Sequence, residues 1–450
     1  MMTNQIEIPP TESTTIEQQF RTLLDLEPKL VLNFVASNAV EQKRDFIEGG
    51  HPVPLHDYDR LASLDLGAQL DSIKRVGANL LTSEHLPSKH REVYGAYIDR
   101  YLKMTELMHD AQQIAAGSSD DELTRRFMEN NIELYGRPVD ETYRALLSSK
   151  LEPIANKQFH GMAAELKEQL FDMVGYEADA SAEHSYRPNA VTLEWMKTVV
   201  HTLYDGMLSH VPDQEKFTSV EVRDVFDAIL RKEFGDVAAE WTIDLEEATS
   251  IDVKTPEKRV VVPISERMTS REQLRQLVVH EMGVHVLRGI AGGTTDLGPM
   301  ETGLAGYYDS DEGLGVVMEQ ALKGEFKERG VPLYITAGMA YCDNKNFREV
   351  YEAKWRIAAL SKCADGADVT EKILTSAKDI AYRETNRIFR GTDTLPWFKD
   401  LAYYNGSVNV WKHLDSICGD YDKFQFVLMG KADPSNAEHR RAMYETKTVE

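Results

Sequence analysis

The chain has few cysteines, and none is placed to form a familiar cysteine site. Only three occur among 450 residues, Cys342, Cys363 and Cys418, and no pair has the Cys-x-x-Cys spacing. An odd number without that spacing argues against a disulfide framework and against a zinc site built from thiolates. We therefore expect neither.

Long apolar runs are also missing. A membrane-spanning helix needs about 18 consecutive apolar residues, and the sequence has no such run. Residues 1–15 lack the basic and apolar regions of a secretory signal, and their polar composition predicts a disordered tail. These absences favour a soluble, cytoplasmic protein without a membrane partner.

Basic residues are in deficit. There are 51 Lys and Arg against 74 Asp and Glu, which gives a formal net charge of −23. A surface this acidic repels the phosphate backbone of nucleic acids and anionic membranes, so we predict no nucleic-acid partner. The 42% of hydrophobic residues is typical of a folded globular chain.

Apolar residues recur at helical spacing through most of the sequence. We predict helices over 87–116, 120–131, 140–155, 190–209, 219–234, 271–287, 311–329, 346–361 and 370–387. Residues 390–408 look loop-rich. The pattern predicts a predominantly α-helical α+β protein with a helical N-terminal lobe at 16–212 and a second lobe at 213–450.

A change of pattern near residue 240 indicates a small sheet. The segments 241–252 and 259–264 are rich in alternating and β-branched residues and flank a short turn at 255–258, which predicts antiparallel neighbours. The next helix is expected to begin at a capping box, formed by Thr269 with Glu272 or by Ser270 with Gln273.

The strongest chemical signal lies on that helix. His280, Glu281 and His285 are the components of a zinc hydrolase site, with two imidazole ligands and a carboxylate that can take a proton from water. The usual His-Glu-x-x-His spacing places the ligands about 40° apart around a helix, whereas the spacing here gives about 140° on a regular helix. The motif therefore requires a wider, π-type turn or a helix end between the ligands, and Gly283 favours such a distortion.

A catalytic zinc needs a third protein ligand. Glu312 is our first choice, because the Gly-Leu-Gly that follows it lets two helices approach closely around a metal. Glu319 is the alternative, since its spacing from Glu312 places it on nearly the same helix face.

Several ordered motifs extend this pattern over about residues 215–435. They are HEMGVHVLRG at 280–289, EGLG at 312–315, NFREVY at 346–351, RIFRG at 387–391, FKDLAYYNG at 398–406 and GK at 430–431. They resemble the domain-of-unknown-function 1704 family, whose animal members are the microtubule-associated tyrosine carboxypeptidases and whose bacterial members carry a Gln-Glu-Gly-Leu-Ala motif.

The resemblance implies a zincin-like metallopeptidase with zinc on His280, His285 and Glu312 and with Glu281 as the catalytic glutamate. The chain departs from the family at Asp311, where bacterial relatives usually have Gln, at Gly315, where they have Ala, and at Val284, where Thr is expected. The resemblance also implies a substrate that is a peptide or protein C-terminus, with Tyr or another bulky residue removed.

A carboxypeptidase must hold the terminal carboxylate of its substrate, which Arg does best. Candidates are Arg387, Arg390, Lys399 and Arg288, while Tyr403 and Tyr404 are candidates to donate a hydrogen bond to the oxyanion.

Two other functions use the same residues. A non-haem iron enzyme has the same two-His-one-carboxylate ligand set but no need of Glu281. A regulatory or binding protein would keep the site without turnover. We do not expect microtubule binding, because the net charge is −23 and no run of five or more Lys and Arg is present.

Overall fold

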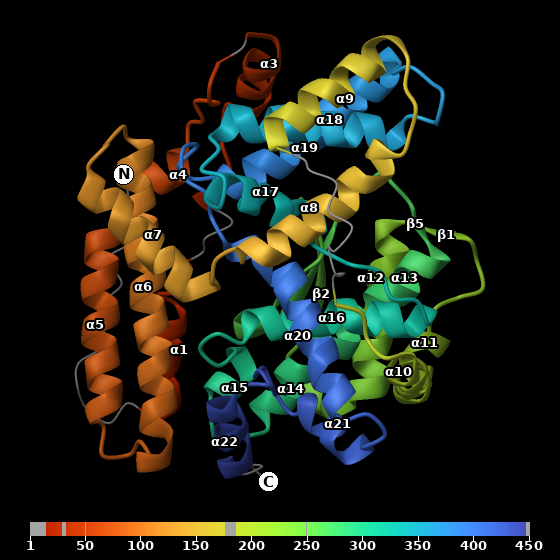
Figure 1. Cartoon of the computed structure of the whole chain (residues 1–450). Coiled ribbons are helices and arrows are strands. Elements are labelled where there is room, and N and C mark those ends of the chain that lie inside the picture. The colour runs from red at the N-terminus through yellow and green to blue at the C-terminus, as the bar shows by residue number, and fades with distance from the viewer. Residues whose placement is uncertain (1–14, 29–32, 50, 176–185, 249, 447–450) are drawn as a thin grey trace.

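The computed structural model describes residues 15–28, 33–49, 51–175, 186–248 and 250–446. The predicted disordered tail at 1–15 lies outside these residues, except for Thr15, which caps the first helix. The chain is mostly helical with a small sheet, as the sequence predicts. Figure 1 shows α16 and α20 crossing near the centre of the molecule.

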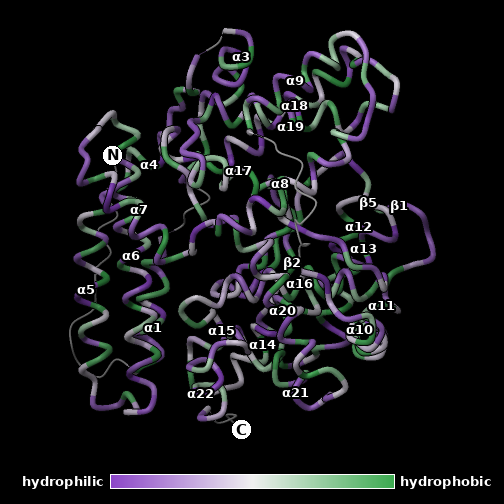
Figure 2. Tube along the Cα trace, viewed as in Figure 1, coloured by the Kyte–Doolittle hydropathy of each residue, from purple (hydrophilic) through white to green (hydrophobic). Residues whose placement is uncertain are grey.

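The first 175 residues contribute helices alone among their described elements, apart from short turns. These helices are α1 (Ile16–Leu24), α3 (Ala39–Gly49), α4 (Asp59–Ala62), α5 (Leu66–Thr82), α6 (Arg91–Ala115), α7 (Asp121–Tyr135), α8 (Asp140–Ala155) and α9 (Gly161–Val174), with the 3-10 turn η1 (Ser88–His90). Figure 2 shows hydrophilic and hydrophobic positions alternating along α5. Its buried residues Ile73, Val76 and Leu80 recur at helical spacing. They therefore lie on one face of α5, and this is the face that packs against the rest of the protein.

The middle of the chain carries the strands and the helix with the histidine motif. Its elements are α10 (Ala190–Leu203), α11 (Asp205–Ser209), β1 (Lys216–Phe217), α12 (Ser219–Ile229), η2 (Leu230–Phe234), η3 (Gly235–Ala238), β2 (Thr242–Glu246), β3 (Asp252–Lys254), η4 (Thr255–Glu257), β4 (Arg259–Pro263), β5 (Thr269–Ser270), α13 (Arg271–Leu277), η5 (Val278–Val286) and α14 (Leu287–Gly293). The helix predicted at 190–209 is divided at Tyr204, which follows the last residue of α10 and precedes the first residue of α11.

The predicted antiparallel sheet is partly wrong. The strand order is β2-β4-β3, and β3, which shares only Asp252 with the predicted segment 241–252, pairs with β4 in antiparallel register across the short connection. However, β2 pairs with β4 in parallel, with Ile243 opposite Val260. The central strand has the buried triplet 260–262, which needs a neighbour on each side. The chain reverses direction between β2 and β3 and again between β3 and β4, so β2 and β4 run parallel, with β4 between the other two strands.

The remaining helices complete the C-terminal part. They are α15 (Pro299–Thr302), α16 (Tyr308–Lys323), α17 (Val331–Tyr341), α18 (Phe347–Lys362), α19 (Glu371–Phe389), α20 (Ala402–Ser416), α21 (Tyr421–Val427) and α22 (Ala437–Glu445), with the 3-10 turn η6 (Lys399–Leu401). The predicted helix at 311–329 begins earlier and ends earlier, because Gly324 adopts φ 70° and terminates it. The segment 390–408 is loop-rich only up to residue 398, since η6 and α20 follow.

Three apolar cores hold the molecule together, and each combines segments distant in the sequence. One joins residues from 34–170 with 331–404, a second joins 196–290 with 314–321 and 410–428, and a third joins 20–101 with 297–304 and 432–443. Met196 and Val211 belong to the same core as the histidine helix. Each core therefore draws residues from both sides of residue 212, and the division into lobes at 16–212 and 213–450 stays a prediction.

Among the described residues, no helix combines the length and apolar character needed to cross a bilayer.

Candidate metal centre

The histidine helix is capped and then widened, as the spacing of its motif requires. Ser270 is the N-cap and exchanges hydrogen bonds with Gln273, so the second of the two predicted capping boxes forms. After α13, the segment Val278–Val286 is a π-helix, whose i to i+5 pattern brings residues five apart onto one face. His280 and His285 consequently lie side by side, with ring centroids 5.0 Å apart.

A buried tyrosine supports the wide turn. The hydroxyl of Tyr204 donates a hydrogen bond to the carbonyl of Gly283 at 2.8 Å. A Cβ at residue 283 would lie 2.8 Å from the Tyr204 ring, so only glycine fits there without displacement. Gly283 is thus required by the close approach of the Tyr204 ring.

The third candidate ligand comes from α16. Glu312 lies one turn after Tyr308, and its carboxylate joins the two imidazoles in a group whose ligand atoms all lie within 4.8 Å of one another. It is the one such group of three or more His, Cys, Asp or Glu residues found among the described residues. The structure thus brings together all three ligands that the sequence predicts and leaves the alternative, Glu319, outside the group.

Small residues on α16 make this approach possible, as the Gly-Leu-Gly motif indicates. A Cβ at Gly313 would lie 2.2 Å from the backbone of Gly406 on α20. A Cβ at Gly315 would lie 2.5 Å from Nε2 of His280. The two glycines therefore let α16 pass between α20 and the histidine helix.

Each histidine is oriented by a carboxylate on α16. Nδ1 of His280 lies 2.6 Å from Glu319, and Nδ1 of His285 lies 2.8 Å from Asp311. When Nδ1–H donates to these carboxylates, Nε2 of each ring keeps its lone pair. This is the tautomer that a metal ligand needs, and it gives Glu319 and Asp311 the role of supporting residues.

Asp311 is the centre of a buried ion network. Arg288 donates to Asp311 and to the carbonyls of Gly430 and Ala432, and Lys431 lies 3.4 Å from Asp311. Burial raises the pKa of Asp311, but Lys431, His285 and Arg288 outweigh it and hold that pKa well below its usual range. The carboxylate therefore stays ionised and available to His285.

Glu281 lies within the same cluster. Burial raises the pKa of its carboxyl group, the two histidines lower it and Glu312 raises it further, so the pKa lies above its usual value. For His280, burial lowers the pKa, but the surrounding carboxylates, Glu319 first, raise it to about 9. Several carboxylates around two imidazoles make a donor set that suits a divalent cation.

The predicted cationic residues gather around one buried carboxylate. Arg387 binds Asp400 through two hydrogen bonds of 2.8 and 2.9 Å, and Arg390 adds a third at 3.2 Å. Burial raises the pKa of Asp400, but Arg390, Arg387 and Lys399 lower it overall. Lys399 donates to the hydroxyl of Tyr308 at 2.9 Å, on the helix that carries Glu312.

The remaining predicted residues lie in different places. The guanidinium of Arg387 lies 5.2 Å from the centroid of the Tyr403 ring. The pKa of the Tyr403 hydroxyl is raised, first by burial and second by the charge of the nearby Glu312 carboxylate. Tyr404 is buried, and its ring lies against Tyr334 with centroids 4.8 Å apart. Arg288 is fully buried behind His285, with its donors used by Asp311 and two carbonyls.

Three residues that the sequence analysis did not select also belong to the site. Tyr308 is hydrogen-bonded to Lys399, Lys431 reaches Asp311, and Arg329 reaches Glu319. Tyr308 lies four residues before Glu312, which is a same-face position once the helix is known to begin at residue 308. No comparable signal in the sequence pointed to Arg329.

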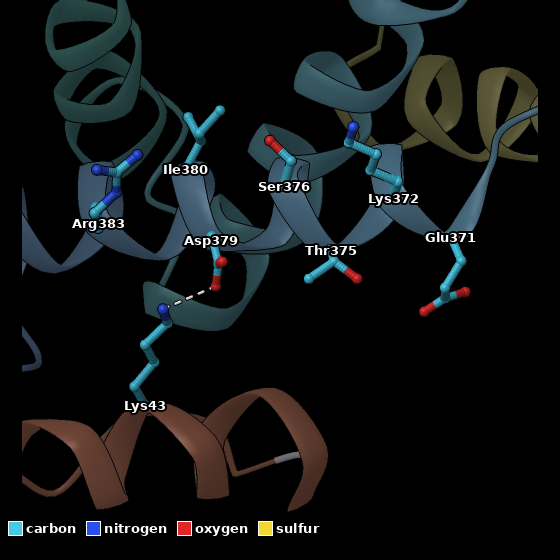
Figure 3. Close-up of a pocket in the computed structure, with 8 residues that line it drawn as sticks. All are labelled: Lys43, Glu371, Lys372, Thr375, Ser376, Asp379, Ile380 and Arg383. Atoms are coloured by element: carbon cyan, nitrogen blue, oxygen red, sulfur yellow. Dashed lines mark ion pairs between the residues drawn. The ribbon is translucent and has the colours of Figure 1, made fainter.

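A surface hollow elsewhere has no part in this cluster. It lies between α3 and α19 (Figure 3), where Lys43 forms an ion pair with Asp379 at 2.8 Å. The residues that line it carry both charges and are Lys43, Glu371, Lys372, Thr375, Ser376, Asp379, Ile380 and Arg383. None of them is a residue of the metal centre.

Comparison with known proteins agrees with this geometry. No curated protein matches the chain. The family model described as microtubule-associated tyrosine carboxypeptidase matches residues 180–450, which include the histidine helix, α16 and the cationic segment. The match covers more than half of the sequence, and the chain belongs to the microtubule-associated tyrosine carboxypeptidase family.

Proposed function

We propose that the chain is a zinc-dependent carboxypeptidase with a zincin-like arrangement of its site. The observation that supports this most directly is the convergence of His280, His285 and Glu312, with Glu281 beside them. Family membership adds that the relatives are described as carboxypeptidases.

The three ligands would hold a zinc ion through two imidazole nitrogens and one carboxylate oxygen. Zinc bound in this way lowers the pKa of a coordinated water and polarises a carbonyl. The carboxylates of Glu319 and Asp311 keep Nδ1 of each histidine protonated, so that Nε2 faces the shared centre.

Glu281 would move the proton. Its carboxylate oxygen accepts a proton from the attacking water and then returns it to the nitrogen of the leaving amino acid. Burial raises the pKa of this group above its usual value, which makes its carboxylate a stronger base than that of an exposed glutamate. The same residue favours hydrolysis over iron oxygenase chemistry, which has no need of a base here.

The cationic segment supports an exopeptidase. Three cations, Arg387, Arg390 and Lys399, surround the single carboxylate of Asp400, which leaves positive charge for a substrate carboxylate. Tyr308 and Tyr403 lie near both this charge and Glu312, so aromatic surface is available beside it. We propose Tyr or another bulky residue as the one removed from a peptide or protein C-terminus.

The direct test uses pairs of peptides that differ only at the C-terminus. Zinc-loaded protein should release the last residue from peptides with a free carboxylate, and mass spectrometry should find no release from the matching C-terminal amides. Peptides ending in Tyr, Phe, Ala and Lys would define the preferred residue. Equal cleavage of the amides would contradict a carboxypeptidase, and absence of cleavage across the whole series would favour the non-catalytic alternative.

A further inference from the structure

The two histidines are supported in the same way but in different surroundings. Behind His285, Asp311 is held by Arg288, whose side chain is 0% exposed, and by Lys431, whose side chain is 5% exposed. Behind His280, Glu319 is held by Arg329, whose side chain is 47% exposed. One histidine is therefore anchored inside the protein, and the other is anchored to its surface.

Arg329 reaches Glu319 from a short segment between α16 and α17. Its guanidinium Nη2 donates to Oε2 of Glu319 at 2.9 Å, while Oε1 of the same carboxylate faces Nδ1 of His280. Gln320 fixes the segment by donating to the carbonyl of Lys327 at 2.7 Å. The segment that carries Arg329 is therefore hydrogen-bonded to α16, the same helix that carries Glu319.

The ring of His280 lies against two positions of α16 four residues apart. Gly315 faces Nε2, where a Cβ would approach to 2.5 Å, and Glu319 faces Nδ1. Gly315 restricts the ring only by contact, so the direction of Nε2 depends on the hydrogen bond at Nδ1. Glu319 has several rotatable bonds, and a second partner on its other oxygen reduces the rotamers it can occupy.

We propose that Arg329 is a positioning residue for the metal ligand His280 and acts through Glu319. This inference rests on the proposed metal site. Because Arg329 is half exposed, its pairing with Glu319 is screened by salt, whereas the buried Asp311 network is not. Metal affinity therefore depends on ionic strength through the His280 side of the site.

The experiment measures zinc affinity of the full-length chain by competition with a chromophoric chelator at low and high salt. Loss of a supporting residue typically weakens metal binding 10- to 100-fold, and Glu319→Gln should fall in that range. Arg329→Gln should weaken binding by about 3- to 10-fold at low salt, because an exposed ion pair contributes less, and the difference should shrink at high salt. Arg329→Lys should restore part of the affinity.

A matched control and a second measurement separate positioning from general stability. Arg125→Gln removes an arginine that is 56% exposed and paired with Glu122 and Glu129 on α7. It should leave zinc affinity unchanged. In the cobalt-loaded protein, Arg329→Gln should alter the visible absorption spectrum, while the melting temperature of the metal-free protein stays the same.

The outcomes are distinguishable. Zinc affinity of Arg329→Gln equal to that of the original chain, or lowered equally in Arg125→Gln, would overturn the role of Arg329. Failure of the original chain to bind zinc at all would overturn the proposed metal site itself.

Discussion

The carboxylate of Asp311 lies 2.8 Å from Nδ1 of His285 and is shared with two buried cations. At this position the sequence departs from the Gln-Glu-Gly-Leu-Ala motif that the family resemblance led us to expect. A glutamine amide can accept a hydrogen bond from the histidine, but it carries no charge to balance Arg288 and Lys431. The aspartate therefore has two functions, orientation of a ligand and neutralisation of a buried charge.

Replacement of Asp311 should affect both functions. Asp311→Asn should weaken zinc binding by about 10- to 100-fold through the loss of a charged support for His285. It should also destabilise the fold by about 3–5 kcal/mol, because two buried cations lose their partner. Chelator competition and denaturant unfolding measure the two effects. Asp224→Asn, at an exposed ion pair with Arg223, is the control and should change neither.

The metal ligands themselves provide a simpler test. Purified protein should contain about one zinc per chain, because the described part of the chain holds one group of three candidate ligands. His280→Ala and His285→Ala should each remove the metal, as measured by elemental analysis after dialysis. Unchanged zinc content in both variants would show that the metal is bound elsewhere. His201 lies outside the cluster, and its ring is hydrogen-bonded to the backbone carbonyl of Leu322. The His201→Ala variant should therefore keep its zinc.

Glu281→Gln separates metal binding from catalysis. Glutamine keeps the shape of the side chain but cannot accept the proton, so zinc content should be unchanged and peptide hydrolysis should fall by about 100- to 10,000-fold. The fall should appear in kcat, and KM should change little, because Glu281 is not expected to bind the substrate carboxylate. Full activity in this variant would exclude Glu281 as the general base.

Gly313 tests whether the close crossing of α16 and α20 is required. Gly313→Ala places a Cβ 2.2 Å from the backbone of Gly406, so it should destabilise the protein by about 1–3 kcal/mol or more and weaken zinc binding through Glu312. Gly95→Ala on α6 is the matched control, because a Cβ there meets no atom within 4 Å. It should be neutral or stabilise by up to about 1 kcal/mol. Equal effects of the two substitutions would argue against the crossing.

The sequence predicts the candidate metal ligands better than it predicts the residues that hold those ligands in place. The spacing between His280 and His285 is too wide for a regular helix, so a local feature of the sequence predicted either a π-type turn or a helix end between them, and the structure has the π-helix. Glu312 was recognisable because small residues follow it. By contrast, the partners of Asp311 come from residues 288 and 431, and no local pattern reports such distant contacts.

Errors in the fold have similar causes. A third strand, β3, lies between β2 and β4 along the chain, so two reversals make β2 and β4 parallel, and strand alternation carries no information about that order. The predicted end of this helix at residue 329 is wrong, because Gly324 adopts φ 70° and terminates α16 earlier. Arg329 consequently lies outside the helix, where it can turn back towards Glu319.

The last prediction concerns the substrate. The family description includes association with microtubules, whereas the chain has a net charge of −23 and no run of five or more basic residues. A protein that binds the acidic tubulin surface needs an extended basic face. Arg387 and Arg390 are already paired with Asp400, so they suffice for one terminal carboxylate and not for an acidic lattice. We therefore expect a short peptide or the flexible C-terminus of another protein as substrate.

Co-sedimentation with microtubules at physiological salt checks this expectation. The Glu281→Gln variant is the appropriate form, because it retains the proposed substrate site without cleaving the tubulin tail. It should remain in the supernatant, and the active protein should release little Tyr from assembled α-tubulin compared with an isolated Tyr-ending peptide. Microtubules whose tails have been removed by limited proteolysis serve as the control for non-specific pelleting. Substantial pelleting that requires the tails, together with release of Tyr from the lattice, would show that net charge is a poor guide here and that a local surface recognises the polymer.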